Sequence, residues 1–175
     1  MNPSKSPKNN RDGNEDESYS EELNRGKKYL DLLFKYRPRT EQEVKGRLQD
    51  KGYPDEVIDD LVRWARSSGR VDDGAFARYL IEDRMQHKPS GRSGLYKELL
   101  DHGVDPETAN NALDEKLSER DEETECRRLA KKRLKRYRGD DTKAKYRKTS
   151  AFLTRRGFSR SNVNRVLKEL LFDDD

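Results

Sequence analysis

The chain has 175 residues, of which 42% are charged and only 30% hydrophobic, and its formal net charge is +4. So few apolar residues cannot easily fill one thick globular core, and no segment approaches the length of an apolar membrane span. The composition favours several small helical units with thin cores, because helix-forming residues dominate and no alternating β-branched segment is present.

The first 22 residues differ from the rest in being almost entirely polar and charged. Tyr19 is their only large side chain with an apolar body after Met1. Such a segment buries too little surface to offset the entropy of ordering, so we expect residues 1–22 to form a disordered tail. They lack the apolar core of a signal peptide, and the single Cys126 excludes an intramolecular disulfide. We therefore expect a cytoplasmic protein.

One sequence pattern occurs three times, at residues 51–62, 102–113 and 156–167. The copies align on three glycines, each with a leucine four positions before it and an apolar residue directly after it: Gly52, Gly103 and Gly157. Glycine adopts the left-handed conformation that ends many helices, and the flanking apolar pair then makes contact. Each copy predicts a helix end, a tight turn and a new helix. Three copies at a long period indicate a tandem array.

The first repeat has an apolar stripe at Leu30, Leu33 and Phe34 that stops before Pro38. A second helix follows, with a capping box of Thr40 and Glu43. A third is predicted from about residue 55 to 68. Pro54 occupies its capping position, so either Asp55 takes over or the side-chain cap is lost. We expect Trp64 to belong partly to the core.

The second repeat begins with a helix that carries Phe76, Ala77, Leu80 and Ile81 on its inner face. The segment 88–91 ends this helix, and a helix with Leu95 and Leu99 follows. Gly91 and Gly94 have the spacing of a fragment of a phosphate-binding loop. The supporting strand and the Gly-Lys-Ser/Thr sequence are absent, so the spacing favours a turn.

The third repeat is strongly basic. Residues 127–160 contain 15 Lys and Arg against two acids, whereas residues 23–126 contain 19 against 23. Its first helix places Cys126, Leu129, Ala130, Leu134 and Tyr137 on one face, and we expect six cations without acidic neighbours on the other: Arg127, Arg128, Lys131, Lys132, Lys135 and Arg138. Many runs of charged residues are only solvated surface. A run in which every charge is positive, however, favours binding to a polyanion or an acidic protein.

The sequence contains no pattern typical of an enzyme. His87, His102 and Cys126 have no metal-binding spacing, and neither a nucleophile motif nor a Walker loop is present. We predict no catalytic residue, cofactor or metal site. The predicted fold is all-α, an elongated array of three three-helix repeats at residues 23–70, 71–119 and 120–175 after the tail at 1–22.

Several segments resemble the RecX family of bacterial recombination regulators. They are residues 37–62 (RPRTEQEVKGRLQDKGYPDEVIDDLV), 67–84 (SSGRVDDGAFARYLIEDR), 91–104 (GRSGLYKELLDHGV) and 152–167 (FLTRRGFSRSNVNRVL). Their order and spacing span about residues 25–171. The resemblance implies an elongated all-α protein of three three-helix repeats. It also implies binding to the RecA recombinase, especially its filament on single-stranded DNA, and suppression of strand exchange, ATP hydrolysis and co-protease activity.

Three functional hypotheses follow. The first is a regulator that binds RecA or its filament. The second is a direct nucleic-acid-binding module that uses the cations of the third repeat, and the third is a helical adaptor for another acidic protein. We expect a monomer. If the basic surface of the third repeat is only solvated, the next candidate partner-binding residues are Arg63, Arg66, Arg70, Arg78 and Arg84.

Overall fold

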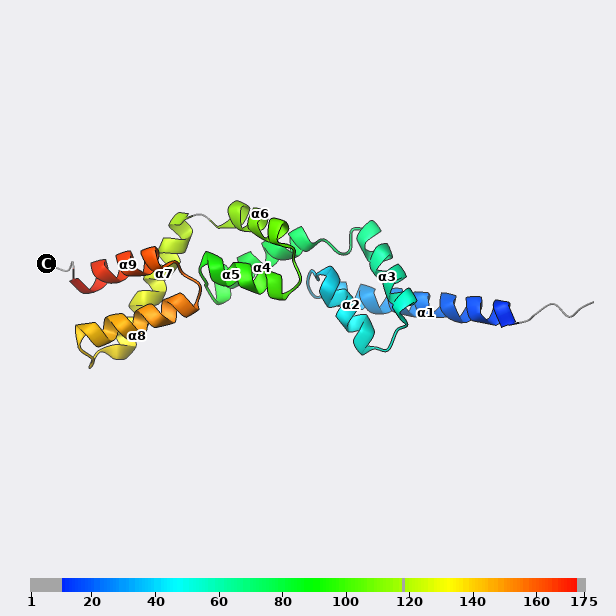
Figure 1. The fold of residues 1–175 in the computed structure, drawn as a ribbon, viewed down its shortest axis with the longest axis horizontal. Helices are drawn as coiled ribbons and strands as arrows, with labels where there is room; N and C mark the ends of the chain where they lie inside the picture. Colours follow the sequence, from blue (N-terminus) through cyan, green and yellow to red (C-terminus); the bar gives the residue numbers. More distant parts are fainter. Residues whose placement is uncertain (1–10, 118, 173–175) are drawn as a thin grey trace, which may run out of the picture. The chain divides into compact units, whose positions relative to one another are not determined.

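The computed structural model describes residues 11–117 and 119–172, and in these residues the chain is helical without any strand (Figure 1). The helices are α1 (Arg11–Phe34), α2 (Glu41–Asp50), α3 (Asp55–Ser67), α4 (Asp73–His87), α5 (Arg92–Asp101), α6 (Pro106–Lys116), α7 (Glu119–Leu134), the short 3₁₀ helix η1 (Lys135–Tyr137), α8 (Thr142–Arg155) and α9 (Arg160–Phe172). They confirm the predicted all-α fold with three helices in each repeat. None of these helices is both long enough and apolar enough to cross a membrane.

Each repeat has its own small core, and the chain falls into two compact units. The unit up to Asp72 contains α1, α2 and α3 around Leu30, Val44, Leu48 and Leu61. The unit from Asp73 onward contains two cores, one built by α4 to α6 and one built by α7 to α9. The low apolar content of the chain is therefore spread over three thin cores.

The predicted tail extends too far along the chain. Residues 1–10 lie outside the described residues, but α1 already begins at Arg11. Tyr19 packs on the first core and donates a hydrogen bond of 2.8 Å from its hydroxyl to Oδ2 of Asp60 on α3. The boundary predicted at residue 22 is corrected for residues 11–22, because the tyrosine ring finds an apolar surface and an acceptor that composition alone cannot reveal.

The three repeated turns have the predicted geometry. Gly52, Gly103 and Gly157 all have positive φ, at 77°, 83° and 82°. In each turn the amide after the glycine donates to the carbonyl of the leucine five residues earlier, as from Tyr53 to Leu48 at 3.2 Å. This bond, with the glycine amide donating to the following carbonyl, is the Schellman arrangement. The repeat alignment is thereby confirmed.

Most of the predicted helix starts are also confirmed. The Thr40 hydroxyl accepts from the Glu43 amide at 3.1 Å, and Asp105 accepts from two amides of α6, with Pro106 as the first helical residue. In α3 the N-cap residue is Pro54, and no side chain caps the helix. The proline therefore removes the cap in the first repeat.

The second and third repeats meet through glycines. The Gly91 amide donates to the Arg156 carbonyl at 2.9 Å, and the Ser93 hydroxyl donates to the Gly157 carbonyl at 2.7 Å. A Cβ atom at Gly94 would lie 2.6 Å from the Arg156 carbonyl oxygen, so there is no room for a side chain. The glycines that resemble part of a phosphate loop form the start of α5 and its contact with the turn between α8 and α9.

Candidate functional site

The basic surface of the third repeat lies on α7 and on the segment that follows it. Cys126 and Ala130 are fully buried, so α7 directs its opposite face outward, with Lys131 and Lys132 exposed. The α-helix ends at Leu134, earlier than the sequence predicts, and Lys135 lies in η1. Four of the six predicted cations are exposed and have no ion-pair partner among the described residues: Lys131, Lys132, Lys135 and Arg138.

The prediction of cations without acidic neighbours is wrong for the other two. Arg127 forms ion pairs with Glu123 on its own helix and with Glu169 on α9. The hydrogen bond to Glu169 raises the pKa of Arg127, so its charge is held against this acid. Arg128 pairs with Glu125 at 2.7 Å. Glu123 lies four residues before Arg127, and Glu125 lies three residues before Arg128, so both pairs lie within one helix. Only the pair of Arg127 with Glu169 depends on the tertiary fold.

The arginines proposed as second candidates in the first two repeats are all engaged in ion pairs. These pairs are Arg63–Asp60, Arg66–Glu41, Arg70–Asp31, Arg78–Glu115 and Arg84 with both Asp83 and Glu98. An ion pair has no net charge, so it largely cancels the field that the cation presents to a distant anion. The exposed pairs contribute little to stability. These five arginines are therefore weaker candidates than the exposed cations of the third repeat that have no ion-pair partner among the described residues.

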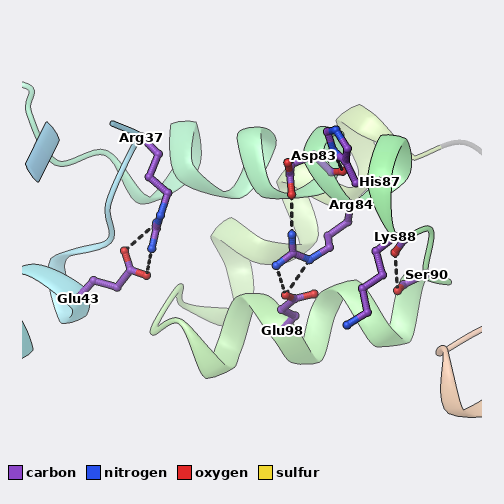
Figure 2. Close-up of polar contacts among 8 residues, drawn as sticks. All are labelled: Arg37, Glu43, Asp83, Arg84, His87, Lys88, Ser90 and Glu98. Atoms are coloured by element: carbon purple, nitrogen blue, oxygen red, sulfur yellow. Dashed lines mark hydrogen bonds and ion pairs between the residues drawn. The ribbon is translucent and has the colours of Figure 1, made fainter. Parts of the chain in front are cut away.

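Figure 2 shows the best-defined of these pairs, between α4 and α5. Arg84 donates from Nε at 2.9 Å and from Nη2 at 2.7 Å to the same carboxylate oxygen of Glu98. The hydrogen bond to Glu98 raises the pKa of Arg84. The same figure shows a bidentate pair between Arg37 and Glu43 in the first repeat. In both places a carboxylate neutralises the guanidinium.

A small pocket between α7 and α8 contains cations that were not among the predicted site residues, apart from Lys132. It has a volume of about 180 Å³ and is lined by Leu129, Lys132, Arg133, Arg136, Phe152 and Arg156. The Arg133 guanidinium carbon lies 4.6 Å from the centre of the Phe152 ring, and that of Arg156 lies 5.5 Å from it. Cation–π contacts of this kind hold the guanidinium groups over the ring.

One polar atom of a residue that lines this pocket has no partner among the described residues. The Nε of Arg133 is buried and forms no hydrogen bond among the described residues. The spacing of Leu129, Lys132, Arg133 and Arg136 is that of one helical face, and this signal was present in the sequence. The outward face of the helix was predicted instead at residues such as Lys131 and Lys135. Phe152 and Arg156 reach the pocket only through the tertiary fold.

The comparisons with known proteins agree on one family. Models of the first, second and third three-helix domains of RecX match residues 33–63, 72–113 and 121–167 in order. The "Regulatory protein RecX" of Thermobifida fusca is 34% identical over 134 residues, covering 77% of this chain and 72% of the relative. The protein of the same name from Pelodictyon phaeoclathratiforme is 34% identical over 146 residues, covering 82% and 89%.

Solved structures agree on the fold. The crystal structure of RecX from Lactobacillus salivarius superimposes with a TM-score of 0.77 at 21% identity, covering 86% of this chain and 97% of that one. A second structure, described as regulatory protein RecX, gives a TM-score of 0.81 at 19% identity and covers 98% and 82%. With three consecutive domain models and relatives above 30% identity over most of both chains, this chain belongs to the RecX family of regulatory proteins.

Proposed function

We propose that this chain binds the RecA recombinase, above all its filament on single-stranded DNA, and lowers strand exchange, ATP hydrolysis and co-protease activity. The observation that carries the proposal is the match of all three RecX domain models in order along the chain. The relatives are named regulatory proteins, which agrees with a role exerted through binding and without a reaction of its own.

The charge distribution supports the proposal independently of the family. Exposed lysines without acidic partners in the described part of the chain, among them Lys131 and Lys132 on α7, give the third repeat a positive field. A filament of protein on DNA presents phosphates and carboxylates, and opposite charge accelerates association and orients the partners. We propose that the exposed cations of the third repeat steer the chain to the filament, and that it acts as a cytoplasmic monomer.

The test measures ATP hydrolysis by RecA on single-stranded DNA while this chain is added to preformed filaments. We expect hydrolysis to fall at amounts of the chain below those of RecA, and the chain alone to hydrolyse no ATP. Sedimentation of the filament should carry the chain with it. If hydrolysis and sedimentation are unchanged even at equimolar chain, the proposal is wrong. Light scattering of the purified chain checks the monomer.

A further inference from the structure

The pocket between α7 and α8 occupies a position at which the second repeat holds an ion pair. In α4, Arg84 lies three residues after the buried Ile81, and in α7, Arg133 lies three residues after the buried Ala130. On the facing helices, Glu98 and Phe152 both lie five residues before the glycine of the repeated turn. Arg133 is therefore the counterpart of Arg84, and Phe152 replaces the carboxylate that neutralises it.

This replacement leaves an arginine prepared to bind an anion. Arg84 uses Nε and Nη2 on Glu98, whereas the Nε of Arg133 is buried without a partner among the described residues. No carboxylate takes the place of Glu98 beside Arg133, so the charge of this guanidinium has no anion beside it in the pocket. Phe152 still holds the Arg133 guanidinium, through the 4.6 Å cation–π contact.

The first repeat supplies a contrast. Arg39 also has a buried Nε without a hydrogen bond, and burial lowers the pKa of this arginine. Its pocket, however, is lined by Glu43 and Asp50 as well as by cations. The Oε2 atom of Glu43 lies 3.9 Å from Nη1 of Arg39. The residues that line the Arg133 pocket include four cations and no acid. The Arg39 pocket sets two acids against three arginines, whereas the Arg133 pocket has no acid against its four cations.

The pocket is also held in place from the neighbouring repeat. Arg156 lies over Phe152 and donates from Nη1 to the Pro89 carbonyl at 3.4 Å, and its own carbonyl accepts from Gly91. These contacts fix the segment that carries Arg156 before any ligand arrives. Less ordering is then needed on binding, which favours affinity.

We propose that this pocket binds one phosphate group of a nucleic-acid strand, with the guanidinium of Arg133 donating to it and with Lys132, Arg136 and Arg156 supplying the surrounding positive charge. Four cations favour a phosphate over a single carboxylate, because a phosphate presents more oxygen atoms around one centre to the surrounding donors. The volume of about 180 Å³ leaves little room for a base, so recognition is of the backbone and independent of sequence. This inference does not depend on RecA, and its test contains none.

The first experiment measures the affinity of the full chain for a fluorescent oligothymidylate at low salt. Arg133→Gln and Phe152→Glu each lower the net charge by one, and the second rebuilds the carboxylate partner found in the second repeat. We expect each to weaken binding about tenfold. Lys131→Gln, an equal charge change on the exposed face of α7, should weaken it less than about threefold. Phe152→Gln removes the ring without adding charge and should cost less than Phe152→Glu.

The second experiment follows the arginine Nε–H resonances while inorganic phosphate is added. The Arg133 resonance, assigned by its loss in Arg133→Gln, should shift, and that of Arg39 should not. The proposal is overturned if Lys131→Gln weakens oligothymidylate binding as much as Arg133→Gln, or if the Arg39 resonance shifts equally. Competition by oligoglutamate as effective as by unlabelled oligothymidylate would overturn the phosphate assignment, and equal competition by a nucleoside triphosphate would overturn the assignment to a strand. If Phe152→Glu does not fold, as judged by circular dichroism, Arg133→Gln and the resonance shift still decide.

Discussion

Gly157 lies against Gly94 so closely that a Cβ atom built on Gly157 would stand 2.0 Å from the Gly94 amide nitrogen. The two residues are 63 positions apart, one in the turn before α9 and the other in the first turn of α5. Together with the hydrogen bonds of Gly91 and Ser93 to the same turn, this contact joins the second and third repeats inside one compact unit. Glycine is needed here for space as well as for its backbone conformation.

Two helical glycines should therefore respond oppositely to the same substitution. Gly46 lies inside α2 with nothing within 4 Å of a Cβ atom, so Gly46→Ala should raise the free energy of unfolding by about 1 kcal/mol through helix propensity. Gly94→Ala gains the same propensity but would place its Cβ 2.6 Å from the Arg156 carbonyl, so it should lower the stability of the second unit. Urea denaturation followed by circular dichroism measures both. A stabilising Gly94→Ala would show that the repeats separate freely at this contact.

The glycines of the repeated turns should all resist a β-branched residue. Gly52→Val, Gly103→Val and Gly157→Val each force a positive φ on valine, which should cost about 1–2 kcal/mol or more. Gly157→Val should be the most destabilising, because its side chain also meets Gly94, whereas a Cβ on Gly52 meets nothing within 4 Å. Thermal melts of the three variants test the order. Parent-like melting of all three would contradict the role of these turns.

The amino-terminal part of α1 should contribute to the first core. Residues 1–10 carry no large apolar side chain after Met1, so their deletion should leave the melting temperature within about 2 °C of the parent value. Deleting residues 1–22 also removes Tyr19, which packs on the core and bonds to Asp60, and should lower the stability of this unit by about 1–3 kcal/mol. Fluorescence of Trp64, the one tryptophan of the chain, reports on this unit. Equal melting of both truncated chains would contradict the packing of Tyr19.

The exposed lysines of the third repeat should matter for binding and barely for folding. Lys131→Glu with Lys135→Glu should weaken inhibition of RecA while the helical signal and melting temperature persist, because neither lysine has an ion-pair partner among the described residues. Inhibition by the parent should also decline as salt rises. Arg127→Ala is the contrasting variant. It breaks the link from α7 to Glu169 on α9 and should lower the melting temperature. A double lysine variant that inhibits like the parent at low salt would exclude this surface.

Cys126 should make stability fall at alkaline pH. It is fully buried, and burial raises the pKa of its thiol from 9.0 to about 11. The folded state thus holds the proton more tightly than the unfolded state. The contribution is fully present below pH 9 and is lost as the pH rises towards 11, with a slope of at most about 1.4 kcal/mol per pH unit. The difference in unfolding free energy between the parent and Cys126→Ala, measured across this range, should shrink. A constant difference would contradict the burial of the thiol.

The sequence alone determined the features that depend on neighbours along the chain. A leucine, a glycine and an apolar residue within six positions specify a helix end, and the same pattern in three places specified three repeats. The caps at Thr40 and Asp105 were predictable for the same reason, since each cap and its partner amides lie within three residues.

The tertiary structure decided which charges are neutralised and where space is absent. Arg127 meets Glu169 across 42 residues, and Gly94 meets Gly157 across 63, so neither relationship leaves a local signal. The pocket of Arg133 likewise needs Phe152 and Arg156 from α8 and the turn that follows it. The sign of the charge on the third repeat was visible in its composition. The surface that this charge forms depends on packing between helices, because an ion pair requires two side chains within about 4 Å in the folded chain.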